Sequence, residues 1–257
     1  IVMQSRQHYL EFVVILGALT AFAPLAIDMY LPALPTIAQA LQGSTGQGQF
    51  TLASFFVGFA LGQALLGPLA DRYGRKRPLY AGLVLFVAAS GVCALAASMQ
   101  ILAAARFVQA VGACAGAVVG RAMVRDLFEP ADTVRVFSTL MLVMGVAPIL
   151  APLAGGYLLV GLGWRAIFWF LAAFGLACLL AALRLPETHR AAAPRPLDPG
   201  RVLRDYRALL GHRRYLGHVL AGACSAAGMF AYIAGSPFVF IELYGVPPQH
   251  YGWLFGS

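Results

Sequence analysis

Long runs of apolar residues restrict the fold of this chain more than any other feature of its sequence. A helix needs about 20 apolar residues to cross the hydrocarbon core of a bilayer. Apolar runs of this order cover residues 12–35, 50–70, 78–120, 136–164, 166–183 and 215–241. The run 78–120 is about twice as long as one span requires, so we expect a turn near residues 98–100. The runs predict an all-α, polytopic membrane helix bundle with seven spans, followed by the start of an eighth over 243–257.

The composition supports a membrane protein and disfavours several other classes. Of the 257 residues, 60% are hydrophobic and 11% are charged, whereas an average soluble domain has about 25% charged residues. The runs are continuous rather than alternating, which disfavours a β-barrel. The cysteines are widely spaced within apolar runs and the histidines have no ligand spacing, so we expect neither disulfides nor a metal site.

The first apolar run has a second interpretation, as a cleaved signal peptide. Arg6 precedes the run, and Ala21-Phe22-Ala23 resembles a cleavage site. Pro24 follows directly and disfavours cleavage, so we expect the run 12–35 to remain as the first span.

The basic residues predict the orientation in the membrane. All but two of the 18 lysines and arginines lie in the N-terminal segment or in the loops after the second, fourth and sixth spans. Because short cytoplasmic loops are rich in Lys and Arg, the N-terminus is expected in the cytoplasm. The net charge of +8 is therefore interpreted as a topology signal that faces anionic lipid, and no nucleic-acid partner is expected.

Three regions are expected along the chain. Residues 1–184 are predicted to form a six-span bundle, and residues 215–257 the truncated start of a second bundle. Between them, 185–214 contains four prolines among its charges, which is typical of a flexible cytoplasmic linker. The missing initial Met and the abrupt end lead us to expect a fragment of a longer protein.

The loop between the second and third predicted spans carries a dense motif. We expect Gly67 to let the helix end pack closely and Gly74 to permit the turn. The string resembles the G-x-L-a-D-r-x-G-r-k-r signature of the major facilitator superfamily. The matching residues are Gly67, Leu69, Asp71, Arg72, Gly74, Arg75, Lys76 and Arg77.

Asp71 is the only acid in this motif, and its partner is an open question at this point. We expect it near Arg72, or near the basic end of the fourth span around Arg121 and Arg125. A positively charged partner on the same side of the membrane would give a latch that opens and closes during transport. The alternative is an ordinary positively charged loop with no further role.

Two ionisable residues lie inside predicted spans, Asp28 and Arg106. A charge there costs about 2.5–3.5 kcal/mol on insertion scales, so such residues usually have a function. Each lies six residues from an outer span end, which at about 1.5 Å per residue places both at a similar depth. They are expected to face the interior and to pair, either as a fixed ion pair or with Asp28 as a titratable carboxylate.

The fourth predicted span continues with a recognisable pattern after its arginine. Arg106, Gln109 and Gly112 resemble the fourth-span motif of proton-coupled members of the same superfamily. The resemblance implies that Asp28, Arg106 and Gln109 take part in proton coupling. Tyr30 is a candidate for the wall of an apolar drug cavity, with lipid-facing packing as the alternative.

The fifth predicted span contains Pro148 and Pro152, four residues apart, which should bend the helix. With Gly155 and Gly156, the segment resembles the G-x-x-x-G-P-x-x-G-G antiporter motif of the superfamily. Alanines replace two of its glycines, and an ordinary kinked helix is the alternative.

The strings at 27–35, 164–168 and 235–239 resemble the Bcr/CflA group of drug:proton antiporters, the bicyclomycin-resistance proteins. The resemblance implies a twelve-span, multi-pass exporter in the bacterial inner (plasma) membrane. Its substrates would be amphipathic drugs of the bicyclomycin, chloramphenicol or sulfonamide type, exchanged for protons. The proton gradient would supply the energy without a cofactor, and a monomer is expected.

Two other functions remain in view. A proton-coupled carrier of one specific small solute or metabolite could use the same fold. A membrane enzyme is disfavoured, because Asp28 is the only acid inside a predicted span and no catalytic cluster accompanies it.

Overall fold

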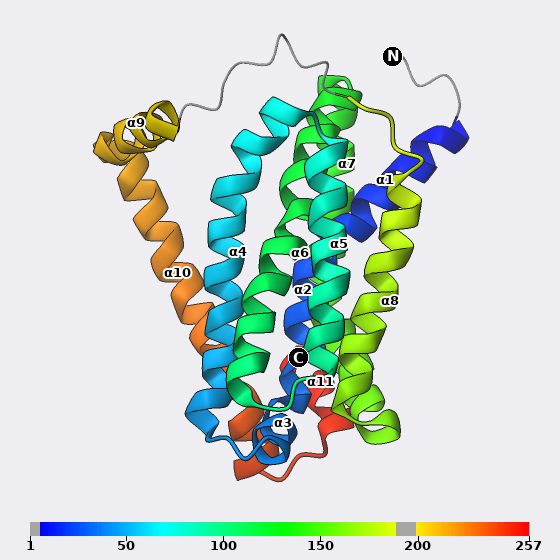
Figure 1. The fold of residues 1–257 in the computed structure, drawn as a ribbon, viewed down its shortest axis with the longest axis vertical. Coiled ribbons are helices and arrows are strands. Elements are labelled where there is room, and N and C mark those ends of the chain that lie inside the picture. Colours follow the sequence, from blue (N-terminus) through cyan, green and yellow to red (C-terminus); the bar gives the residue numbers. More distant parts are fainter. Residues whose placement is uncertain (1–5, 189–198, 257) are drawn as a thin grey trace.

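The computed structural model describes residues 6–188 and 199–256, and every regular element in these ranges is helical (Figure 1). Within these two ranges, seven helical segments are long and apolar enough to cross a membrane. They are Tyr9–Ala40, Thr45–Tyr73, Lys76–Ala94, Met99–Leu127, Pro130–Leu162, Trp164–Ala182 and Arg213–Leu243. The predicted fold class and the seven spans are therefore confirmed.

The first span is not one continuous helix. It consists of α1 (Arg6–Thr20), α2 (Phe22–Asp28), the short 3-10 helix η1 (Leu31–Ala33) and α3 (Leu34–Ala40). Pro32 and Pro35 stand in the first turns of η1 and α3, where a missing N–H removes no helix hydrogen bond. The breaks place Asp28 at the last position of α2, between two helical pieces.

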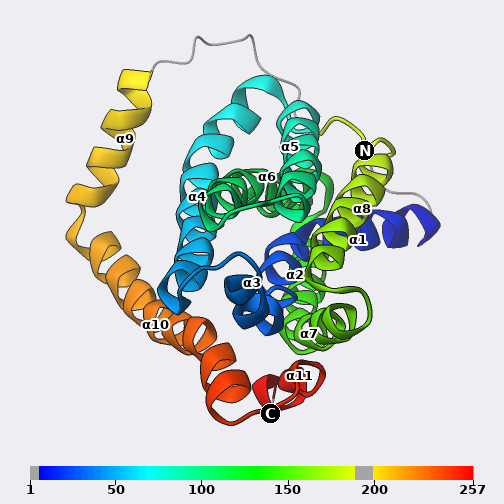
Figure 2. The same ribbon diagram turned by 60° about the horizontal axis from the view of Figure 1, so that its bottom comes forward.

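The centre of the bundle is α6 (Met99–Leu127), which packs between α4 (Thr45–Tyr73) and α5 (Lys76–Ala94) (Figures 1 and 2). Glycines permit this approach. A Cβ on Gly58 would collide with the Phe107 carbonyl, and one on Gly112 would lie 2.6 Å from the Gly82 oxygen. Small residues at such crossings let membrane helices pack backbone to backbone. The turn before α6 falls where the sequence predicts it, with Ser98 accepting a hydrogen bond from the Ile101 N–H.

Two long helices complete the six-span part of the chain. α7 (Pro130–Leu162) and α8 (Trp164–Ala182) meet at Gly163, whose φ of +82° favours glycine. α8 packs against α5, and α7 packs against α2. The fifth and sixth spans are thus joined by a tight turn at Gly163.

The remaining elements lie along one side of the bundle (Figure 2). They are α9 (Pro199–Gly211), α10 (Arg213–Pro237), the π-helix η2 (Phe238–Leu243) and α11 (Pro248–Gly256). α9 corrects the prediction of a flexible linker over 185–214, because Pro199 occupies the first turn of a helix, where proline is tolerated. Pro194, Pro196, Arg190 and Arg195 of that linker lie outside the described residues. The division into 1–184, 185–214 and 215–257 stays a prediction.

Candidate functional site

The most deeply buried charge in the described chain is Arg106, on α6, whose side chain has no exposed surface. Its Nη1 donates to the Ala26 carbonyl over 2.9 Å and to Gln109 Oε1 over 2.7 Å. Ala26 lies two residues before Asp28 on α2. The first span and the fourth span are therefore joined by the guanidinium at the level of the helix break.

Aromatic rings surround the rest of this guanidinium. Its Cζ lies 4.3 Å from the Phe55 ring centroid, 4.5 Å from that of Tyr30 and 6.0 Å from that of Phe168. A cation over aromatic faces is attracted by the ring quadrupoles, most strongly where water is absent. In the described part of the chain, Nε and Nη2 of Arg106 have no hydrogen-bond partner. The arginine is therefore well held on one side and retains two unused donors.

Hydrogen bonds extend from Arg106 to neighbouring spans. Gln109 Nε2 donates to Ser90 Oγ on α5 over 2.7 Å, and Ser90 donates in turn to the Phe86 carbonyl. Separately, the hydroxyls of Tyr30 and Thr51 are 2.6 Å apart. Sequence reasoning missed Ser90 and Thr51, because a hydroxyl inside a span commonly bonds its own helix and gives no distinctive signal.

Asp28 is also buried, with 4% of its surface exposed. However, none of the ion pairs or hydrogen bonds found among the described residues involves its carboxylate. The predicted direct pair with Arg106 is therefore not formed. Arg106 instead takes the carbonyl of Ala26, which becomes available because α2 ends at Asp28 and the helix breaks there.

The two glycines of the fifth-span motif lie at contacts on two sides of α7. A Cβ on Gly155 would collide with the Met29 carbonyl, next to Asp28. A Cβ on Gly156 would collide with the Pro248 carbonyl at the start of α11. Pro152 and Pro148 lie about one and two turns earlier, inside the same helix. The motif thus holds α7 between the broken first span and the last described helix.

Gly155→Ala is expected to destabilise the protein by about 1–3 kcal/mol, since the added methyl forces two backbones apart. Gly145→Ala on the same helix is the matched control, because a Cβ there meets nothing within 4 Å. Thermal unfolding of both variants in detergent micelles measures the difference. Equal melting temperatures for Gly155→Ala and the wild type would contradict the close contact.

The motif of the loop between the second and third spans is organised around Arg75, on the turn between α4 and α5. Its Nη1 donates to Asp71 Oδ1 over 2.7 Å, and its Nε donates to Asp126 Oδ2, at the end of α6, over 2.9 Å. Burial lowers the pKa of Arg75, but hydrogen bonds to Asp126 and Asp71 outweigh burial and raise that pKa above its ordinary value. Asp71 was expected near Arg72 or near the end of the fourth span around Arg121 and Arg125, and its ion-pair partner is instead Arg75, one helical turn away at i+4.

The other predicted members of this motif have different surroundings. Arg72 lies over the Tyr73 ring at 4.9 Å, and Arg77 is exposed. A Cβ on Gly67 would meet nothing within 4 Å, so the expected close packing at Gly67 is not found. Gly74 has a φ of +83°, which confirms that this glycine permits the turn.

Glu187, just after α8, is a further residue that sequence reasoning missed. Its carboxylate accepts from the backbone N–H groups of Arg75 and Lys76 over 2.8 and 3.1 Å. N–H groups in the first turn of a helix have no carbonyl partner within that helix, and a negative charge is favourable at this end of α5. A Cβ on Gly74 would lie 2.8 Å from the same carboxylate. The segment after the sixth span is thereby fastened to the turn between α4 and α5.

Glu187→Ala is expected to speed amide exchange at Arg75 and Lys76 roughly tenfold to a hundredfold, because hydrogen bonds to a charged group contribute about 1.5–3 kcal/mol. Hydrogen–deuterium exchange of the peptide covering this turn gives the rate. Glu129→Ala serves as the control, since Glu129 precedes α7 without forming a side-chain cap. Unchanged exchange in Glu187→Ala would show that its carboxylate does not hold the turn.

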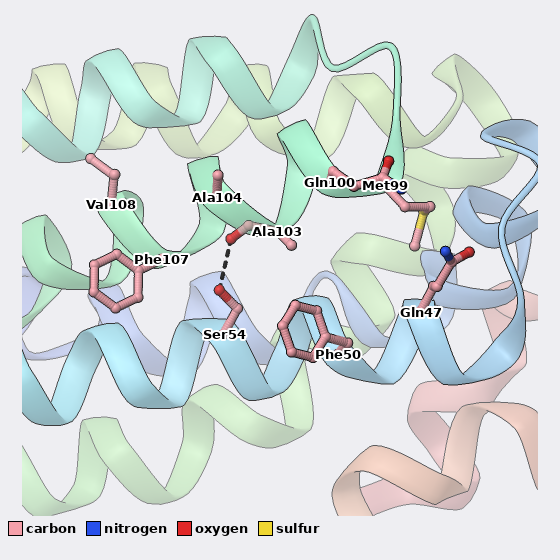
Figure 3. Close-up of a pocket in the computed structure, with 9 residues that line it drawn as sticks. All are labelled: Gln47, Phe50, Ser54, Met99, Gln100, Ala103, Ala104, Phe107 and Val108. Carbon is pink, nitrogen blue, oxygen red and sulfur yellow. Dashed lines mark hydrogen bonds between the residues drawn. The ribbon is translucent and has the colours of Figure 1, made fainter.

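Two cavities lie near these helices. One, of about 640 Å³, opens between α4 and α6 near the N-termini of both helices, with Phe50 and Phe107 on opposite walls (Figure 3). There, Ser54 Oγ donates to the Ala103 carbonyl over 2.8 Å (Figure 3). The other, of about 430 Å³, lies between α2 and α7 and is bordered by Met29. Tyr30 lines neither cavity; its side chain is buried beside Arg106.

Comparison with known proteins gives a consistent assignment. The model of the Major Facilitator Superfamily matches residues 16–257. An uncharacterized MFS-type transporter, YdgK of Bacillus subtilis, is 40% identical over 98% of this chain and 63% of its own length. The bicyclomycin resistance protein homolog of Haemophilus influenzae is 35% identical over 98% of this chain and 64% of its own. The multidrug resistance protein MdtL of Escherichia fergusonii is 32% identical over 95% and 62%.

Solved structures show the same fold at low identity. A bacterial homolog of the human lysosomal transporter Spinster superposes with a TM-score of 0.79 at 18% identity, over 98% of this chain and 59% of that one. A D-xylose–proton symporter gives 0.70 at 16% identity, over 98% and 65%. The chain thus spans somewhat under two thirds of the curated relatives that it matches.

Proposed function

The chain belongs to the Major Facilitator Superfamily, and we propose that the protein exports amphipathic drugs across the bacterial inner (plasma) membrane in exchange for protons. The family makes it a multi-pass membrane transporter of small molecules rather than an enzyme. Relatives named for bicyclomycin resistance and multidrug resistance support the drug class. The cytoplasmic position of the N-terminus is part of the same proposal, supported by the basic loops.

One observation carries the proton-coupled part of this proposal. Asp28 is buried, lies at a helix break and has no described ion-pair partner, while the Arg106 guanidinium binds the carbonyl two residues before it. A buried carboxylate without a fixed partner is costly when ionised. It therefore gains a proton easily unless a cation or a polar ligand approaches.

This arrangement suggests how exchange proceeds. With Asp28 ionised, a polar or cationic part of the drug stabilises the carboxylate, and apolar surface nearby receives the rest of the molecule. Protonation from the outside removes that stabilisation and favours release, so drug and proton bind in competition. Arg106 contributes by fixing the first span to the fourth at this level, so that a change in the protonation of Asp28 affects both spans.

Drug tolerance of cells tests the proposed function directly. Cells that lack their own pumps should survive higher concentrations of bicyclomycin, chloramphenicol or a sulfonamide when they express the protein. Asp28→Asn should remove this protection, whereas Asp132→Asn should not, because Asp132 is half-exposed and pairs with Arg135 on the protein surface. Unchanged drug tolerance together with proton-dependent uptake of one solute would favour the specific carrier instead.

A further inference from the structure

α9 has a clear division between an apolar and a basic face, unlike the membrane-spanning helices. Tyr206, Leu209 and Leu210 follow one another at the spacing of one helical face. Their exposed fractions are 39%, 45% and 57%. The described part of the protein therefore leaves much of this apolar face uncovered.

Positive charge is concentrated in the same segment. Residues 199–214 contain five arginines and one acidic residue, Asp205. The arginines are Arg201, Arg204, Arg207, Arg213 and Arg214. Arg207, Arg213 and Arg214 are exposed. A surface of this sign is complementary to anionic phosphate groups.

The chain itself fixes the level at which α9 lies. His212 alone separates it from α10, whose first residues open a candidate membrane span. The Tyr206 hydroxyl donates to the Ala64 carbonyl on α4 over 3.0 Å, so the apolar side is turned toward the spans. α9 lies outside the bundle, beside the N-terminal end of α10. This is the same end of the molecule as the turn between α4 and α5 (Figures 1 and 2).

We propose that α9 lies along the cytoplasmic surface of the bilayer, with its apolar face among acyl chains and its arginines on anionic lipid headgroups. A helix with one apolar and one basic face is stable at such an interface. Direct connection to a membrane span favours lipid over a soluble partner, because the bilayer is already at that level. The contact holds the connection between the sixth and seventh spans at the membrane surface.

Site-specific fluorescence in nanodiscs tests this placement. In a variant whose native cysteines are replaced, a fluorophore is attached at Leu210→Cys on the apolar face or at Ala208→Cys on the opposite side. In phosphatidylglycerol discs, the Leu210 label should be quenched by lipids with brominated acyl chains. The Ala208 label should instead be quenched by iodide in water.

A second set of measurements tests whether the arginines bind the lipid headgroups. Lipid quenching at Leu210 should be weaker in phosphatidylcholine discs. It should also be weaker in phosphatidylglycerol discs for Arg207→Gln and Arg213→Gln, by about fivefold in the binding equilibrium per arginine. Arg135→Gln is the control, because Arg135 is an exposed arginine of α7 outside this segment.

Three results would overturn the proposal. Equal iodide quenching at the two positions would place α9 in water. Protection of Leu210 from both quenchers would mean that protein covers the face. Equal lipid quenching in both disc types and in the arginine variants would remove the headgroup contact.

Discussion

Arg106→Lys is expected to reduce drug export at least about fivefold, because a buried polar group that loses its partners costs about 1–3 kcal/mol. The guanidinium bonds Ala26 and Gln109 through one nitrogen while its Cζ lies over the rings of Tyr30 and Phe55. A lysine ammonium retains the charge, but it has no planar face and is more strongly hydrated. Uptake of a fluorescent drug into inverted vesicles measures the loss.

The matched control for this variant is Arg165→Lys. Arg165 also lies over an aromatic ring, with its Cζ 4.2 Å from the Trp164 centroid, but it is exposed at the start of α8. Both variants should insert in the membrane in normal amounts and elute as single species in detergent. Full transport by inserted Arg106→Lys would mean that charge alone suffices and that the geometry around the guanidinium is irrelevant.

The fold was largely predictable because the membrane imposes strong local rules. Continuous apolar runs gave the spans, and the polar residues near Ser98 marked the turn before α6. The linker was harder, because Pro199 was interpreted with the prolines before it. In the structure it opens α9, a position where its missing N–H has no cost.

The candidate site was predictable only as a set of residues. The cost of a charge in a span singled out Asp28 and Arg106, but it could not identify what Arg106 bonds. Gln109, three residues on, is a partner that the spacing does place within reach. The other partners are a backbone carbonyl exposed by a helix break and aromatic rings, and neither follows from sequence spacing. Glu187 was missed for a similar reason, since its partners are N–H groups more than a hundred residues away in the sequence.

Asp28→Asn is expected to abolish export against a gradient while some drug binding remains. Asparagine occupies a similar volume and keeps a polar contact, but it cannot carry a proton. Because Asp28 has no described ion-pair partner, the substitution leaves no buried cation without its counter-charge. Drug binding to the purified variant, measured by calorimetry, should therefore survive at reduced affinity. Complete loss of binding together with normal insertion would make Asp28 a drug ligand first and leave its role in proton coupling without support.

Drug-induced proton movement tests the central claim most directly. The protein is reconstituted in vesicles with an imposed pH gradient and an internal pH-sensitive dye, and drug is added to one side. We predict proton flux on drug addition in the wild type and in Asp132→Asn, and none in Asp28→Asn. Proton flux that persists undiminished in Asp28→Asn would contradict the account and place the coupling group elsewhere.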